Sequence, residues 1–136
     1  MNTNEIMLDT NILISAALFP SASMTAFLTR VAKNHHIVLC SYILDELNDV
    51  IRRKFPGKQR QVEVFLQKLP FSLVHTPKLD LVGLDIAIRD EADYPILMSA
   101  VLADVDILIT GDKGFHNAEI EKPKIMTPAE FMAQSS

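Results

Sequence analysis

A single acidic residue, Asp9, interrupts an apolar stretch that spans residues 6–14. The two residues after Asp9 carry a hydroxyl and an amide, and the apolar residues then resume. A carboxylate is costly to bury unless a cation, a metal ion or several hydrogen bonds compensate its charge. The simplest geometry ends a buried strand at Asp9 and leaves its carboxylate at the carboxyl end of that strand. The rest of the chain must supply the groups that meet it there.

The composition favours one globular domain. The 136 residues suffice for a substantial core, and 49% of them are apolar. The apolar segments are broken within about a dozen residues, which is too short to cross a bilayer. No signal-peptide pattern opens the sequence, and the one cysteine, Cys40, cannot form an internal disulfide. We therefore expect a single cytoplasmic domain over residues 1–136 with no membrane partner.

Apolar runs typical of strands alternate with amphipathic stretches typical of helices. Strands are expected at residues 6–9, 37–40, 71–76, 107–110 and 124–126. Helices are expected at residues 11–18, after Ser23, and at residues 41–54, 58–69, 94–103 and 128 onward. Ser23, Ser41 and Thr127 are the expected capping residues, and the last is followed by a proline and by Glu130, a good helix start. Residues 79–88 allow either a loop or a short helix.

This alternation predicts an α/β fold with three layers, in which a parallel sheet of four to five strands has helices on both faces. In such a sheet the carboxyl ends of the strands and the starts of the following helices lie along one edge, where ligands bind.

Four acidic residues fall on that edge by topology, namely Asp9, Glu46, Asp93 and Asp112. Carboxylates held close together repel one another and raise each other's pKa unless cations are present. Oxygen ligands without a histidine or cysteine cluster favour Mg²⁺ or Mn²⁺ over zinc. Such ions activate water for in-line attack on phosphorus. The topology therefore predicts a divalent-metal site.

Each acidic residue also has a purely structural interpretation. Asp93 suits a helix N-cap, Asp112 suits a turn, and Glu46 suits a solvated helix face. Asp9 is the hardest to explain in this way, because it interrupts apolar sequence at a strand end. Four acids on one edge favour a shared site over four unrelated roles.

Four segments carry a resemblance to a known family: residues 8–13 (LDTNIL), 44–47 (LDEL), 90–97 (DEADYPIL) and 103–113 (ADVDILITGDK). In order and spacing they resemble PIN-domain ribonucleases, in particular the VapC-type toxins of toxin–antitoxin systems. The resemblance covers nearly the whole chain, and its DTN and TGDK segments together are quite specific.

The resemblance implies a Rossmann-like PIN domain that cleaves RNA with Mg²⁺ or Mn²⁺. It implies that the four acids named above bind the metal, and that Asn11 and Thr110 support the site by hydrogen bonds. It also implies a homodimer, and an antitoxin protein that inserts into the site or covers it. In one departure, relatives often carry an acidic residue where this chain has Tyr94. Asp90 is the local substitute, although it also suits a turn.

The densest basic run flanks Pro56 and Gly57 and consists of Arg52, Arg53, Lys54, Lys58 and Arg60. As a solvated helix end it needs no partner, because cations suit a helix C-terminus. Alternatively it binds RNA phosphates, as Lys113 would do beside Asp112. The formal net charge of −4 means that nucleic-acid binding requires such a local patch or bridging metal ions. The four histidines lack the spacing of metal ligands.

Three functions compete. The leading one is a metal-dependent endoribonuclease of the toxin type, whose chemistry needs no protein general base. A phosphatase that forms an aspartyl-phosphate at Asp9 would require a second aspartate where Asn11 stands. A catalytically lapsed domain would act through a protein or RNA partner, but all four expected acidic positions are occupied.

Overall fold

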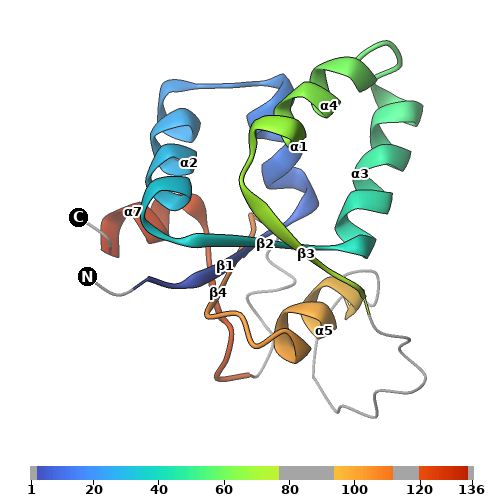
Figure 1. Cartoon of the computed structure of the whole chain (residues 1–136). Helices are drawn as coiled ribbons and strands as arrows, with labels where there is room; N and C mark the ends of the chain where they lie inside the picture. Colours follow the sequence, from blue (N-terminus) through green and yellow to red (C-terminus); the bar gives the residue numbers. More distant parts are fainter. Residues whose placement is uncertain (1–2, 77–93, 112–119, 135–136) are drawn as a thin grey trace.

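The computed structural model describes residues 3–76, 94–111 and 120–134 (Figure 1). Five strands form one sheet in the order β3-β2-β1-β4-β5, and every neighbouring pair is parallel. The strands are β1 (Glu5–Leu8), β2 (His36–Cys40), β3 (Phe71–Val74), β4 (Ile107–Ile109) and β5 (Lys124–Met126). The predicted parallel sheet is confirmed.

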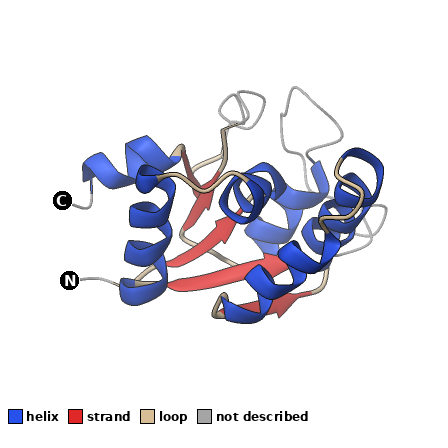
Figure 2. Ribbon diagram, turned by 90° about the horizontal axis from the view of Figure 1, so that it is seen from above, coloured by secondary structure: helices blue, strands red, loops and turns tan. Residues whose placement is uncertain are grey.

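Helices flank this sheet on both sides (Figures 1 and 2). They are α1 (Thr10–Leu18), α2 (Ala22–Asn34), α3 (Ser41–Lys54), α4 (Gln59–Lys68), α5 (Tyr94–Leu102) and α7 (Pro128–Gln134). The chain steps outward from β1 to β3 and then crosses back to β4. Right-handed crossovers therefore place α1 to α4 on one face and α5 on the other. The predicted three layers are confirmed.

The central strands form the core of the molecule. Ile6, Met7 and Leu8 of β1 and Leu108 and Ile109 of β4 are completely buried. Strands covered on both faces read as continuous apolar runs, which explains why these short segments could be assigned from sequence. β3 lies at the edge of the sheet, and its Leu73 is 47% exposed.

Side chains cap the starts of α2 and α7. Ser21, and not the predicted Ser23, caps α2, because its extended backbone lets the side chain accept a hydrogen bond from the Met24 N–H at 3.1 Å. The predicted start of α7 is confirmed. Thr127 Oγ1 accepts from the Glu130 N–H at 3.1 Å, and Glu130 Oε1 accepts from the Thr127 N–H at 2.9 Å.

Ser41 was predicted to cap α3 but is its first residue. Cys40 holds the capping position and makes no side-chain capping bond. The Ser41 hydroxyl instead accepts from the backbone N–H of Thr76 at 2.9 Å, which ties the chain after β3 to the start of α3. β3 itself ends at Val74, two residues earlier than predicted.

The segment 79–88 lies outside the described residues. In the described ranges, no single helix is long and apolar enough to cross a membrane. α1 and α2 meet the length and composition requirement only as a pair, with a bend of 119° between them.

Candidate active site at the carboxyl edge of the sheet

The register of the sheet brings Asp9 and Thr110 together. Leu8 of β1 pairs with Ile109 of β4, so the two residues that follow these strands are neighbours. The Asp9 N–H donates to the Ile109 carbonyl at 3.0 Å and continues the ladder beyond the strand. The Thr110 hydroxyl donates to Asp9 Oδ2 at 2.8 Å, across 101 residues of sequence.

Asp9 is also the N-cap of α1. Its backbone is extended, with φ −67° and ψ 159°, and its Oδ1 accepts from the Thr10 N–H at 2.7 Å. The start of a helix favours negative charge, because its first N–H groups point outward and its dipole is positive there. These donors explain how a residue only 4% exposed can keep a carboxylate at this edge.

Thr10 links Asp9 to a second acid. Its hydroxyl donates to Glu46 Oε1 at 2.5 Å, while its backbone N–H donates to Asp9. Thr10 is buried in the first turn of α1, and the half-buried Glu46 lies in the second turn of α3, which packs on α1. Asp9, Thr10, Glu46 and Thr110 thus form one hydrogen-bonded group on the edge predicted for the site.

The sequence interpretation did not assign a role to Thr10. Thr10 could have been found from its position directly after Asp9 at the start of a helix, where its N–H and its hydroxyl point in different directions. Asn11, the predicted supporting residue, is exposed on α1. In the described part of the chain its side chain makes no hydrogen bond, and its supporting role stays a prediction.

Four other predicted residues, Asp90, Asp93, Asp112 and Lys113, lie outside the described residues, so their roles also stay predictions. Within the described ranges, no three histidine, cysteine, aspartate or glutamate side chains are placed to hold one metal ion. The described residues therefore contain two of the four predicted ligands, Asp9 and Glu46.

The basic run lies away from this edge. Arg52, Arg53 and Lys54 form the last turn of α3, about 9–12 Å along the helix axis from Glu46. Arg52 and Arg53 both contact the Asp49 carboxylate, at 3.1 and 2.9 Å. Their role in nucleic-acid binding stays a prediction.

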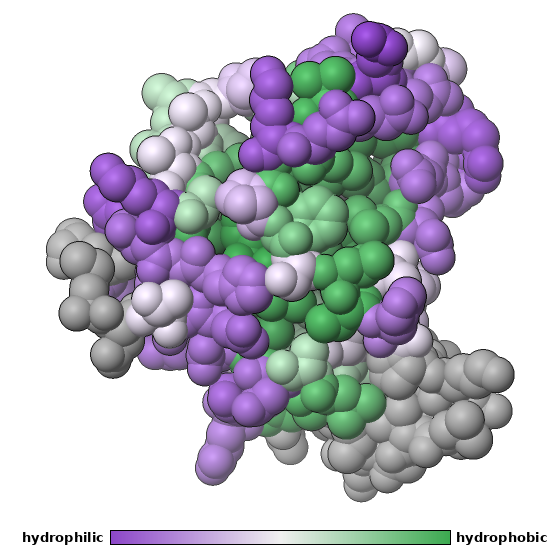
Figure 3. Space-filling model, viewed as in Figure 1, coloured by the Kyte–Doolittle hydropathy of each residue, from purple (hydrophilic) through white to green (hydrophobic). Residues whose placement is uncertain are grey.

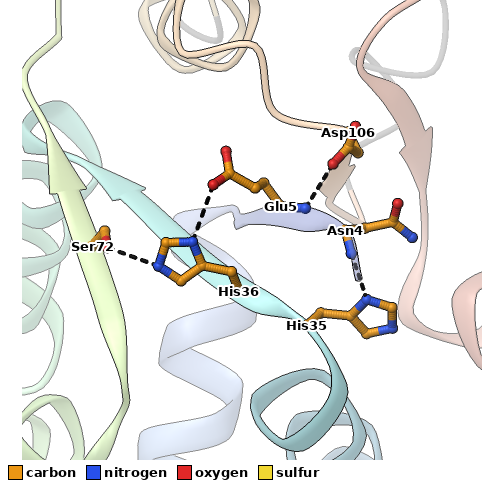
Figure 4. Close-up of polar contacts among 6 residues, drawn as sticks. All are labelled: Asn4, Glu5, His35, His36, Ser72 and Asp106. Carbon is orange, nitrogen blue, oxygen red and sulfur yellow. Dashed lines mark hydrogen bonds and ion pairs between the residues drawn. The ribbon is translucent and has the colours of Figure 1, made fainter. Parts of the chain in front are cut away.

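A second polar group occupies the opposite, amino edge of the sheet (Figure 4). There the His36 ring of β2 bridges its neighbours: Nδ1 lies 3.1 Å from Glu5 Oε1 on β1, and Nε2 lies 2.8 Å from Ser72 Oγ on β3. The N–H of Glu5 donates to Asp106 Oδ2 at 2.7 Å. These contacts join three adjacent strands and the turn before β4.

His35 is held differently. Its Nδ1 accepts from the backbone N–H of Asn4 at 3.0 Å, and its ring lies edge-on to Phe131 at 5.5 Å. Burial lowers the pKa of His35 below its ordinary value of 6.5, because the charged form loses hydration. The neutral ring is also the form that can accept the Asn4 hydrogen bond.

Fold and site together define an α/β domain of the kind that gathers acidic side chains at the carboxyl edge of a parallel sheet. The chain belongs to the PIN domain family, whose model matches residues 5–114. Members of this family are generally nucleases. The predicted family and fold are thereby confirmed.

The fold recurs in solved structures of other proteins, including two that align with most of this chain. One is VapBC2 from Rickettsia felis bound to a DNA fragment from its promoter, with 24% identity, a TM-score of 0.66, and coverage of 90% of this chain and 96% of that one. The other is the PIN domain of human SMG5, with 14% identity, a TM-score of 0.53, and coverage of 97% and 99%. No curated protein sequence matches this chain significantly.

Proposed function

We propose that this chain is a metal-dependent endoribonuclease that hydrolyses RNA phosphodiester bonds, and that it is the toxin of a toxin–antitoxin pair. The observation that carries the proposal is the buried Asp9 carboxylate, which Thr10 and Thr110 hold at the carboxyl edge beside Glu46. Membership of the PIN family supports the nuclease activity. The VapC-type sequence segments and the similarity to VapBC2 support the toxin role and an antitoxin partner.

The donor set at this edge fits Mg²⁺ or Mn²⁺. Asp9 and Glu46 offer carboxylate oxygens, the ligands that hard divalent cations prefer. Asp93 and Asp112 are proposed to complete the set, with Asp90 as the substitute for the acid absent at position 94. A bound ion of this kind makes water more acidic and neutralises charge that develops on the phosphate.

The chain's own contribution is to fix the direction of the carboxylates. The Thr10 N–H donates to one oxygen of Asp9 and the Thr110 hydroxyl donates to the other, so the carboxylate has a defined orientation. The Thr10 hydroxyl does the same for Glu46. Because both threonines are buried at the ends of regular elements, these acids are held in place before substrate arrives.

The test is cleavage of single-stranded RNA by the purified chain with Mn²⁺ and after chelation. Activity that depends on Mn²⁺ and is abolished in Asp9→Asn and Glu46→Gln supports the proposal. Asp45→Asn is the matched control, because Asp45 is the exposed acid adjacent to Glu46 on α3. Metal-dependent cleavage that survives Asp9→Asn would show that the site is wrongly assigned.

Calorimetry separates an active site from a catalytically lapsed one. The proposal requires Mn²⁺ to bind the wild-type chain and to bind Asp9→Asn more weakly, whereas a lapsed site would bind none.

We further propose a cytoplasmic homodimer whose antitoxin inserts into the acidic edge or covers it. Light scattering over a range of protein concentrations tests the dimer.

A further inference from the structure

An aromatic pair, in which Phe19 is exposed and Phe55 is half-buried, lies beside the basic run at the end of the molecule where α1 and α3 finish. Phe19, the C-cap of α1, is 59% exposed. Its ring centroid lies 5.7 Å from that of Phe55 in an edge-to-face arrangement, and Phe55 is the C-cap of α3 directly after Lys54. A single exposed phenylalanine is ordinary on a protein surface. Here the ring is placed next to a concentration of positive charge.

That charge contrasts with the rest of the chain. Residues 49–60 hold five basic side chains and one acid, whereas the remainder holds eight basic and sixteen acidic residues. Arg52 and Arg53 are 71% and 57% exposed despite their contacts with Asp49, so they keep donors free for a ligand. In the described ranges, Lys54, Lys58 and Arg60 form no ion pair. Figure 3 shows the resulting hydrophilic surface over the turn between α3 and α4, at the upper right.

We call this surface the α3–α4 tip and define it by the aromatic pair and the five cations: Phe19, Phe55, Arg52, Arg53, Lys54, Lys58 and Arg60. The tip is tied to α1, because Gln61 Nε2 of α4 donates to the Ala17 carbonyl at 3.0 Å. Gly57, with φ +88°, makes the tight turn between the two helices. The α4 N-terminus adds the positive end of a helix dipole.

The tip and the candidate active site are joined by two helices. α1 begins beside Asp9 and runs for nine residues to the tip, about 14 Å. On α3, Arg53 lies seven residues beyond Glu46, about 10 Å along the axis. A nucleic-acid strand that reaches the acidic edge therefore needs only a short extension to reach the tip.

We propose that the α3–α4 tip is a binding site for single-stranded RNA, in which a base stacks on the Phe19 ring and the arginines and lysines bind phosphates. This inference rests on the proposed function and adds to it a binding surface for the RNA outside the acidic edge. Unpaired bases expose the flat faces that an aromatic side chain can stack on, whereas a duplex hides them. The exposed Phe19 ring suits the unpaired bases of such a strand, and the five cations suit its phosphates.

The binding test uses the full chain carrying Asp9→Asn, so that RNA is not cleaved, and measures anisotropy of a labelled single-stranded RNA. Phe19→Ala is expected to weaken binding about 5- to 160-fold, the range found for loss of one stacked base. Phe19→Tyr should restore it. Leu102→Ala is the matched control, because Leu102 is 53% exposed on α5. Thermal melting confirms that each variant is folded.

Salt dependence tests the cations. Replacing Arg53 and Lys58 by glutamine should reduce the slope of log affinity against log salt by about 1.4, the value for two lost contacts to a single strand. Lys33→Gln with Lys124→Gln removes two exposed cations elsewhere and should leave the slope unchanged. A 2-aminopurine in the RNA should be quenched by the wild-type tip and not by Phe19→Ala.

Cleavage assays separate this inference from the proposed function. With Asp9 intact, Phe19→Ala should raise KM for a long RNA without changing kcat, and should not affect a dinucleotide. If the chain never cleaves RNA but binds it through Phe19, the tip stands and the nuclease proposal fails. The proposed binding site would be overturned if Phe19→Ala and Leu102→Ala bound single-stranded RNA equally well. It would also be overturned if Phe19→Ala weakened the binding of duplex and single-stranded RNA equally. Unchanged RNA affinity with lost self-association would assign it to a protein contact.

Discussion

The carboxyl and amino edges of the sheet both carry acids in hydrogen bonds between strands, but they hold those acids differently. At the amino edge, Glu5 lies against His36 and Asp106 lies 3.5 Å from Lys122, with all four side chains more than a third exposed. At the carboxyl edge, Asp9 is buried, and its described hydrogen bonds come from a backbone amide and a hydroxyl.

The difference indicates what each edge is for. Exposed ion pairs add little to stability and leave their charges well hydrated. A buried carboxylate is costly to stability, and such a cost is typical of a functional site. Substitutions at the carboxyl edge should therefore change activity, whereas those at the amino edge should change only stability.

The largest effect on RNA cleavage is expected from Asp9→Asn, and Asp106→Asn at the amino edge is its control. Loss of Asp9 should lower RNA cleavage more than about 100-fold, since even residues that only orient metal ligands cost 10–100-fold. Asp106→Asn should leave cleavage unchanged. Steady-state assays with Mn²⁺ measure both, and equal losses in the two variants would remove the distinction between the edges.

Thr110→Val should have the next largest effect. It keeps the shape of the side chain but removes the hydroxyl that Asp9 accepts from, so kcat should fall about 10–100-fold. Unfolding in denaturant should show a loss of about 1–3 kcal/mol, the penalty for a buried acceptor left without its donor. Thr110→Ser restores the hydroxyl and should recover most of the activity. A valine variant with full kcat would contradict a positioning role.

A smaller effect concerns pH at the amino edge. The pKa of His35 is lower in the folded chain than in the unfolded one, so the unfolded chain binds the proton more readily. His35 therefore contributes stability above its ordinary pKa of 6.5, and this contribution is lost as pH falls below that value. Melting temperatures measured above and below this pH should differ less in His35→Gln than in the wild type. If the melting temperatures of the wild type and His35→Gln changed equally with pH, the effect would be excluded.

The smallest effect is expected from His36→Gln. Its contacts with Glu5 and Ser72 are exposed, and such pairs contribute about 0.2–1 kcal/mol. Cleavage should be unaffected. A double-mutant cycle with Glu5→Gln measures the coupling, and a coupling well above that range, or an altered kcat, would mean that the two edges are not independent.

The fold could be predicted because its determinants are local. The buried runs of β1 and β4 are continuous apolar segments, and parallel pairing then places Asp9 and Thr110 at one edge whatever the exact strand bounds. Local signals were weaker at helix starts. Ser21 and Ser23 are chemically the same cap, and only the backbone conformation at Ser21 distinguishes them.

The details of the site depended on packing that the sequence does not display. Adjacent residues on a helix point about 100° apart, so Thr10 faces α3 while Asn11 faces solvent. Which of the two meets Glu46 follows from how α1 packs on α3. The resemblance implies a supporting role for Asn11, which stays a prediction, and the hydrogen bonds among the described residues add Thr10 to the site.

The central place of β1 also sets when the site can form. β1 is the first strand of the chain, but its partner β4 comes roughly a hundred residues later, with Thr110 directly after it. Because synthesis proceeds from the N-terminus, the edge of β1 that pairs with β4 has no partner while β2 and β3 are synthesised. A nascent chain that has not reached β4 lacks the Thr110 hydroxyl and the strand that positions it. The acidic edge can thus be assembled only after β4 and Thr110 have been synthesised.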